Sequence, residues 1–324
     1  MNTRQTFLDN FNFHETKLDA TEPRKELILG LQNNKKYIPA KFFYDERGSN
    51  LFDKITITPE YYPTRTEKSI LTDQADDIAN TIGAGCTLIE PGSGSSEKVR
   101  LLLDKLLPNC YVPMDISRDY LYKVSQQLAI EYPALQVDAV CSDYTAEMAI
   151  PNSIPKNKRV AFYPGSTIGN FDPEDARDFL SQIRHMVGDD GGLLIGVDLE
   201  KDKHILDAAY NDADGYTEAF NLNILNNVNS HLGTEIDSSL FTHCAHYNQD
   251  LSRIEMHLVS TARQQLSVAD VQLEFFDGES IHTENSYKFT IDSFQKLALA
   301  AGFTAAKVWT DDEELFSVHY LKAA

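Results

Sequence analysis

The sequence predicts an α/β protein in which a mostly parallel sheet, covered by helices on both faces, is joined to a second, smaller α+β unit. Two patterns predict this fold class. Between residues 86 and 198, short apolar runs alternate with stretches of helical periodicity, which is typical of a doubly wound parallel sheet. After Leu199 the alternation stops, and strand-like segments with polar turns follow between residues 242 and 284. We therefore expect one large sheet whose sequence is interrupted by an insertion.

A glycine turn is the centre of the first pattern. An apolar strand ends in Glu90, and a turn through Gly92 and Gly94 leads into a helix expected over Ser95–Leu107. Glycine is needed where φ is positive or where a ligand approaches the main chain, and open α/β sheets bind ligands at this edge. The turn lacks the phosphate-loop pattern, and Glu97 stands where a dinucleotide motif has its third glycine. An acidic strand end before GxG suits a nucleoside carrying a sulfonium cation; a plain strand-to-helix connection is the alternative.

The other elements follow from the spacing of apolar residues along the chain. The first 34 residues are polar with interrupted helical periodicity, and predict short helices. Helical spacing predicts helices over residues 66–82, 117–132, 201–229 and 291–301, with another beginning at Asp172-Pro173. Apolar runs predict strands over residues 110–114, 135–140, 159–163, 192–198, 244–249, 253–260, 272–276, 306–310 and 315–322. The last two fit an antiparallel edge added to a parallel sheet.

Polar residues follow three of these strands directly. Asp115 lies about 20 residues beyond the glycine turn, where an acidic residue can accept hydrogen bonds from ribose hydroxyls; capping the next helix is an equally good interpretation. Asp143 could accept from the exocyclic amine of adenine, with Tyr144 against the ring. Flexible turns at Pro164-Gly165 and Gly169-Asn170 follow the next strand.

The segment from Lys35 to Arg65 is dense in aromatic residues, prolines and turn residues. Such segments form lids or walls of ligand sites, because a rigid aromatic ring with a hydroxyl can cover a ligand and still hydrogen-bond to it. Under the alternative interpretation, Tyr44, Tyr61 and Tyr62 are ordinary core or surface aromatics.

Composition limits the classes of partner. Of the 324 residues 42% are hydrophobic, enough for a globular core, and the net charge is −20. Nucleic acid and anionic membranes reward clustered Lys and Arg, so we expect neither as a partner; the acidity serves solubility or attracts a cationic ligand. Four widely spaced cysteines and nine scattered histidines predict reduced thiols, a cytoplasmic location and no metal. We expect a monomer.

Distinctive segments occur along nearly the whole chain. They are PAKFFYDERGSNLFDKIT, PEYYPTRTE, IEPGSGSSEK, YVPMDIS, FYPGSTIGNF, GVDLEKD, YTEAFNLNIL, RIEMHLVS and HTENSYKF. Through them the sequence resembles the histidine-specific methyltransferases, which use S-adenosylmethionine to convert L-histidine to its α-N-trimethyl betaine, hercynine, the first step of ergothioneine biosynthesis. That family is also similar to fungal N-methyltransferases that act on a prenylated tryptophan.

The resemblance implies a Rossmann-like methyltransferase domain and a substrate-binding domain. The first would comprise residues 63–200 and 287–324, and the second residues 1–62 and 201–286. It also implies that S-adenosylmethionine is surrounded by Glu90, Gly92, Gly94, Lys98, Asp115, Asp143 and Tyr144.

Residues for the amino acid are implied in the same way. Tyr61, Asn170 and Tyr210 would hold its carboxylate, with Tyr44 near the α-amine; Tyr44 and Asn170 are the expected catalytic residues. Glu284 and Ser286 would bind the imidazole, with Met256 packed nearby. Without the resemblance, Glu284 and Ser286 read as a solvated strand face and Met256 as core. Within the resemblance, Tyr62 is the alternative to Tyr61.

The expected chemistry agrees with these residue types. Methyl transfer from a sulfonium requires mainly that a neutral amine be held in line with the methyl group. Tyrosine hydroxyls and an asparagine amide orient the amine without charge, whereas a close carboxylate would favour its protonated, unreactive form. Two other hypotheses stay open: a different amino acid as substrate, such as a tryptophan derivative, or a non-catalytic protein that binds S-adenosylmethionine.

Overall fold

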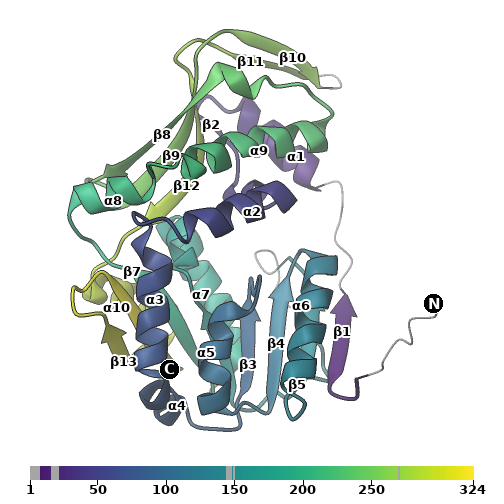
Figure 1. Cartoon of the computed structure of the whole chain (residues 1–324), viewed down its shortest axis with the longest axis vertical. Coiled ribbons are helices and arrows are strands. Elements are labelled where there is room, and N and C mark those ends of the chain that lie inside the picture. The colour runs from purple at the N-terminus through teal and green to yellow at the C-terminus, as the bar shows by residue number, and fades with distance from the viewer. Residues whose placement is uncertain (1–7, 16–21, 144–147, 149, 269–270) are drawn as a thin grey trace.

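The computed structural model describes residues 8–15, 22–143, 148, 150–268 and 271–324. It has two lobes, a lower one built on a large twisted sheet and an upper one built on a smaller sheet (Figure 1). The expected residue boundaries of two domains stay a prediction.

The large sheet has eight strands. Their spatial order is β1 (Phe11–Glu15), β5 (Gln136–Cys141), β4 (Cys110–Asp115), β3 (Thr87–Pro91), β6 (Arg159–Tyr163), β7 (Gly192–Asp198), β14 (Phe316–Ala323) and β13 (Phe303–Thr310). The first six are parallel, and β14 runs antiparallel between β7 and β13. From β3 the chain continues outward through β4 and β5, and then returns to β6 on the other side of β3. This reversal places a topological switch point at the carboxyl end of β3, the usual ligand site of such sheets.

Helices cover both faces of this sheet. On one face lie α3 (Tyr62–Asp73), α4 (Ala75–Ile82), α5 (Glu97–Leu106) and α6 (Arg118–Glu131), and on the other α7 (Pro173–Val187) and α10 (Ile291–Ala300). Because successive strand residues point to opposite faces, Leu88 packs in the cluster with α4 and α5, whereas Ile89 packs in the cluster with α7. Burial on both faces explains why these strands read as continuous apolar runs.

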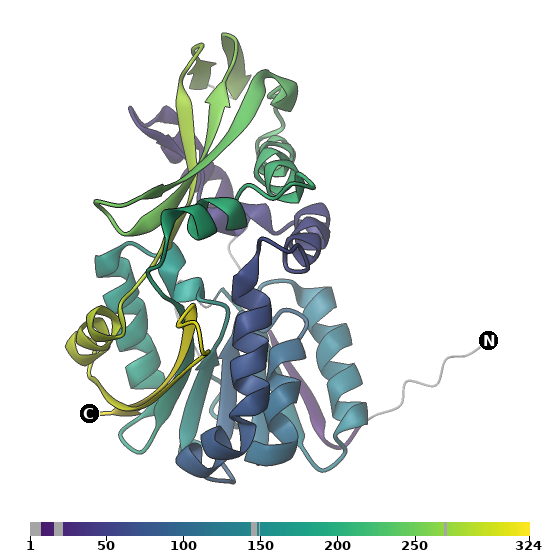
Figure 2. The same cartoon turned by 60° about the vertical axis from the view of Figure 1, so that its left-hand side comes forward.

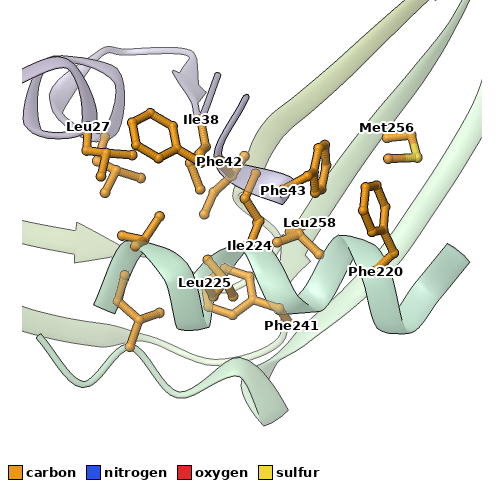
Figure 3. Close-up of a cluster of buried hydrophobic side chains, with 14 of the residues drawn as sticks. Leu27, Ile38, Phe42, Phe43, Phe220, Ile224, Leu225, Phe241, Met256 and Leu258 are labelled. Atoms are coloured by element: carbon orange, nitrogen blue, oxygen red, sulfur yellow. The ribbon is translucent and has the colours of Figure 1, made fainter. Parts of the chain in front are cut away.

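The upper lobe combines a second sheet with helices from two parts of the chain. The sheet has the order β2 (Lys36–Tyr37), β12 (Ser280–Tyr287), β9 (Arg253–Ser260) and β8 (Phe241–Asn248), and a hairpin is formed by β10 (Gln264–Val268) and β11 (Val271–Phe275). The helices are α1 (Glu22–Gln32), η1 (Ala40–Phe43), α2 (Glu46–Ile55), α8 (Lys203–Ala209), α9 (Tyr216–Leu232) and η3 (Ser238–Leu240). Their shared core stacks Phe43 on Phe220, with ring centroids 4.4 Å apart, above Ile224 and Leu225 (Figure 3).

Three of the expected elements differ from the structure. Residues 11–15 were expected in short helices, but their alternating sequence Phe-Asn-Phe-His-Glu forms a parallel edge strand beside β5. The helix expected over residues 66–82 is two helices that meet at Gln74, whose φ is −104° and ψ 8°. The one expected over residues 201–229 is likewise divided, because Gly215 takes a left-handed conformation before α9.

The chain passes between the lobes at three described places. They are the segments from α2 to α3, from β7 to α8, and from β12 to α10. Both views show β12 descending from the upper lobe toward the carboxyl edge of the large sheet (Figures 1 and 2). The 3-10 turn η2 (Thr167–Asn170), which follows β6, packs there so closely that a Cβ on Gly169 would lie 2.7 Å from the carbonyl oxygen of Tyr287.

Candidate active site

The turn between β3 and α5 forms an open cradle of main chain. Gly92 and Gly94 have φ values of 69° and 49°, and a Cβ added to Gly94 would meet no atom within 4 Å. The amide of Ser93 donates to the carbonyl of Met114 at 3.0 Å. Its hydroxyl is buried and has no hydrogen-bond partner among the described residues. A turn that is fixed by its backbone, open at Gly94 and supplied with a spare hydroxyl fits the close approach of a polar cofactor.

Glu90 lies at the base of this cradle and is 2% exposed. Burial raises the pKa of Glu90 to about 8, although a hydrogen bond from the Tyr111 hydroxyl and the charge of Lys98 oppose the rise. The sequence did not mark Tyr111, because a tyrosine inside an apolar strand reads as core. A buried acidic side chain here is a suitable acceptor for the hydroxyl groups of a ribose.

The buried Glu90 should make stability fall as the pH rises. The folded state keeps the proton up to about pH 8, whereas the unfolded chain releases it near its ordinary pKa of 4.5. Stability is therefore lost as the pH rises between these values. We expect the free energy of unfolding of the parent to fall, relative to that of Glu90→Gln, by on the order of 3 kcal/mol between pH 5 and pH 8. Urea unfolding without cofactor measures this difference. An equal difference at both pH values would contradict this assignment.

Asp115 ties the cradle to the end of β4. Its carboxylate accepts from the amide of Gly94 at 3.1 Å and from that of Ser117 at 2.9 Å. The N-cap residue of α6 is Ser117, so Asp115 does not cap that helix. The amide of Ser142, the residue before Asp143, donates to the carbonyl of Asp115 at 3.1 Å, so the end of β5 lies beside the end of β4. Tyr144 lies outside the described residues.

Lys98 faces a buried carboxylate that sequence spacing did not single out. Its ammonium pairs with Glu67 of α3, which is 1% exposed. The same carboxylate accepts from the amide of Gly165 at 2.8 Å. Glu67 therefore joins α3, α5 and the loop after β6 around the cradle. It ends the segment PEYYPTRTE, but the resemblance gave it no role.

Gly196 must be a glycine because of Glu67. A Cβ at this position would lie 1.9 Å from Oε1 of Glu67 and 3.0 Å from the ring of Phe316. We expect Gly196→Ala to destabilise the protein by about 1–3 kcal/mol through overpacking, and to weaken cofactor binding because Glu67 must move. Urea unfolding and calorimetry with S-adenosylhomocysteine measure the two effects. Unchanged values in both would show that Glu67 does not need its present position.

Aromatic rings of the upper lobe form a chain of contacts that reaches Tyr61, just before α3. Tyr44 contacts Phe52 at 5.8 Å between centroids, Phe52 contacts Tyr61 at 6.2 Å, and Tyr61 contacts Tyr210 at 6.2 Å. The structure thus brings together the three tyrosines expected at the amino acid. Burial raises the pKa of Tyr61 and of Tyr210 well above the usual value, so both hydroxyls stay neutral near pH 7. Asn170 is the last residue of η2, beside the end of β12.

Glu284 and Ser286 lie two residues apart on β12. A bulge between His282 and Glu284 shifts the register, and Glu284 then pairs with Met256 of β9. Burial raises the pKa of Glu284 to about 7, against the opposing charge of Lys288. Ser286 is buried and Met256 is 1% exposed, in the same core cluster as Phe220 (Figure 3). The interpretation of this strand as a solvated face is therefore wrong.

A buried ionic cluster lies where the three crossings between the lobes meet. Asp198, at the end of β7, accepts from the hydroxyl of Tyr62 at 2.7 Å and from Lys201 at 2.6 Å, and pairs with Lys288 at 2.7 Å. Burial raises the pKa of Asp198, but the two lysines outweigh it and hold the pKa below the usual value. Sequence reasoning missed Asp198, Lys201 and Lys288. Because the hydroxyl of Tyr62 serves this cluster, Tyr61 is the better candidate for a ligand.

The residues that the structure describes hold no group of three or more histidine, cysteine or carboxylate side chains arranged for a metal ion. Among the helices described, none combines the length and the apolar character needed to cross a membrane.

Comparison with known proteins agrees with this geometry. A family profile described as "Histidine-specific methyltransferase, SAM-dependent" matches residues 23–323. The chain is 40% identical to the histidine N-alpha-methyltransferase of Mycolicibacterium smegmatis, over 89% of this chain and 91% of that protein. It is 38% identical to the protein of the same name from Mycobacterium tuberculosis, over 89% and 91%. It is also 31% identical to ergothioneine biosynthesis protein 1 of Neurospora crassa, over 88% of this chain and 33% of that longer protein. The chain therefore belongs to the family of S-adenosylmethionine-dependent histidine-specific methyltransferases.

Proposed function

We propose that the chain transfers three methyl groups from S-adenosylmethionine to the α-amino nitrogen of L-histidine, forming hercynine for ergothioneine biosynthesis. The observation that carries this proposal is the partly buried carboxylate of Glu284 on β12, two residues from Ser286, whose hydroxyl contacts that of Tyr210. A partly buried acceptor beside a buried hydroxyl suits a ring with one N–H and one unprotonated nitrogen.

The cofactor would lie at the glycine cradle. Bound there, S-adenosylmethionine supplies an electrophilic methyl group. Gly92 and Gly94 would allow close approach, Glu90 and Asp115 would accept from the ribose, and Asp143, with Tyr144, would face the adenine. Lys98 would act by holding Glu67 in place, since its ammonium is already paired with that carboxylate.

The amine would be held by neutral groups. Tyr61 and Asn170 would orient the carboxylate of the amino acid, and Tyr44 would lie near the nitrogen. Tyr210, whose hydroxyl donates to Ser286, would position that serine beside the ring. Raised pKa values keep Tyr61 and Tyr210 protonated, so they do not add negative charge that would favour the ammonium form. Catalysis would then depend on holding the amine lone pair in line with the methyl group. Tyr44 and Asn170 are the proposed catalytic residues.

Product analysis by mass spectrometry tests the proposal. The purified protein is incubated with S-adenosylmethionine and a panel of free amino acids that includes L-histidine and 4-dimethylallyl-L-tryptophan. We expect trimethylated histidine to accumulate while the other amino acids stay unmodified. Methylation of the tryptophan derivative alone would overturn the histidine assignment, and cofactor binding without any turnover would favour a non-catalytic role. Glu284 together with Ser286 favours imidazole over the tryptophan derivative, because an indole has one N–H to donate but no ring nitrogen that can accept.

Two properties of the whole protein complete the proposal. The substrate is a small molecule, and we propose that the protein works as a cytoplasmic monomer. Light scattering at micromolar concentration tests the monomer.

A further inference from the structure

Lys288 makes three hydrogen bonds from a fully enclosed position. Its side chain is 1% exposed, and its ammonium lies 2.7 Å from Oδ2 of Asp198, 2.8 Å from Oγ of Ser286 and 3.2 Å from the hydroxyl of Tyr210. An ammonium has three N–H donors and no acceptor. All three donors of Lys288 are thus used, and two of them are directed at residues of the amino-acid site.

Asp198 does not need Lys288 for neutralisation. Lys201 lies 2.6 Å from Oδ1 of Asp198, and the hydroxyl of Tyr62 lies 2.7 and 2.8 Å from its two oxygens. The cluster therefore holds two ammonium groups for one carboxylate. A surplus buried charge costs free energy unless other groups use it, so the second ammonium calls for a role beyond pairing with Asp198.

Counting protons assigns a direction to the Ser286 hydroxyl. Tyr210 donates its proton to Oγ of Ser286 at 2.8 Å, and Lys288 donates to the same oxygen. A serine hydroxyl has two lone pairs and one proton. With both lone pairs occupied, Ser286 has only its proton left to offer. The proton of Tyr210 is used in the same arrangement, so this pair of hydroxyls presents one donor to a ligand.

We propose that Lys288 is a positioning residue that fixes Ser286 as a hydrogen-bond donor to the side chain of the substrate. With Glu284 as the acceptor, the site then selects a ring with one N–H and one nitrogen lone pair, which is the neutral form of imidazole. This inference rests on the proposed function. It makes Lys288, whose three donors are all used within the protein, a determinant of specificity through Ser286 and Tyr210.

A double-mutant cycle tests whether Lys288 acts through Ser286. KM and kcat for L-histidine are measured at saturating S-adenosylmethionine in the parent, Ser286→Ala, Lys288→Met and the double variant. We expect each single variant to raise KM about tenfold, the effect of one hydrogen bond to a polar partner, with a smaller change in kcat. The double variant should have the KM of Ser286→Ala, because Lys288 then has no hydroxyl to orient at position 286. All four proteins are compared well above pH 7, so that Glu284, whose pKa of about 7 is held down by Lys288, stays ionised in each. If the KM increases of the two single variants multiplied in the double variant, or if KM were unchanged in Lys288→Met, the inference would be overturned.

Lys201→Met is the matched control. It also removes one ammonium from Asp198, but Lys201 bonds Tyr62 and the carbonyl of Leu199 in place of Ser286 and Tyr210. Its KM should stay within about twofold of the parent; a tenfold rise would show that lost charge alone explains Lys288→Met and would overturn the inference.

A second variant covers failure to fold. Lys288→Arg keeps the charge beside Asp198 but replaces three diverging donors by a planar fork. If Lys288→Met does not fold, the same cycle is run with Lys288→Arg. A double variant with the KM of Ser286→Ala would again support the inference, and KM increases that multiply, or no increase in Lys288→Arg, would overturn it. A parent that does not methylate L-histidine would instead disprove the proposed function, so the two failures are distinguishable.

Discussion

Glu284→Ala should raise the KM for L-histidine about ten- to a hundredfold, because a hydrogen bond to a charged group contributes about 1.5–3 kcal/mol and each 1.4 kcal/mol is a factor of ten. The carboxylate is partly buried on β12, and burial raises its pKa to about 7. Lys288 opposes that rise, so a substantial fraction is ionised at neutral pH. The truncation removes the acceptor and leaves the ring N–H of the substrate without a partner. Steady-state kinetics with L-histidine at pH 8 measures the loss.

Glu284→Gln is the matched variant. Glutamine keeps the size and an amide oxygen that can accept, so it should lose only the charge assistance and fall between the parent and Glu284→Ala. Affinity for S-adenosylhomocysteine should be unchanged in both variants, because Glu284 belongs to β12 and the cradle to β3 and α5. A KM within twofold of the parent in Glu284→Ala would remove the imidazole assignment. A parallel loss of cofactor affinity would mean that the change had disturbed the fold.

Local sequence patterns were sufficient to predict most strands of the large sheet. Strands such as Arg159–Tyr163 and Gly192–Asp198 match the expected ranges because their residues are buried on both faces. The turn at Gly92 and Gly94 was found for the same kind of reason, since positive φ requires glycine at a strand-to-helix connection. Phe11–Glu15 was missed, because five residues of alternating polarity at the end of a chain do not reveal the strand beside which they pair.

Local patterns could not have predicted the buried ionic groups. Glu67, Asp198 and Lys288 lie on α3, on β7 and just beyond β12, and each is buried only because of a partner far away in the sequence. A charged residue on its own reads as exposed. Glu284 and Ser286 carried a period-two signal, but that signal does not distinguish a wet face from a buried one. Family resemblance singled out the groups expected to touch ligands, whereas the groups that orient them required tertiary structure.

Asp198→Asn should lower the free energy of unfolding by about 3–5 kcal/mol, the usual cost of removing one partner from a buried ion pair. Asn has nearly the same shape, so the loss comes from charge: Lys201 and Lys288 would stay buried near one another without a carboxylate between them. Urea unfolding at pH 7 measures it, with Asp189→Asn as the control, since that side chain is 98% exposed and paired with Arg184 at the surface. The control should change stability by less than about 0.5 kcal/mol.

Adding Lys201→Met to Asp198→Asn should recover part of the loss, because one unpaired ammonium is then removed. If Asp198→Asn were as stable as its control, the cluster would not hold the crossings between the lobes together.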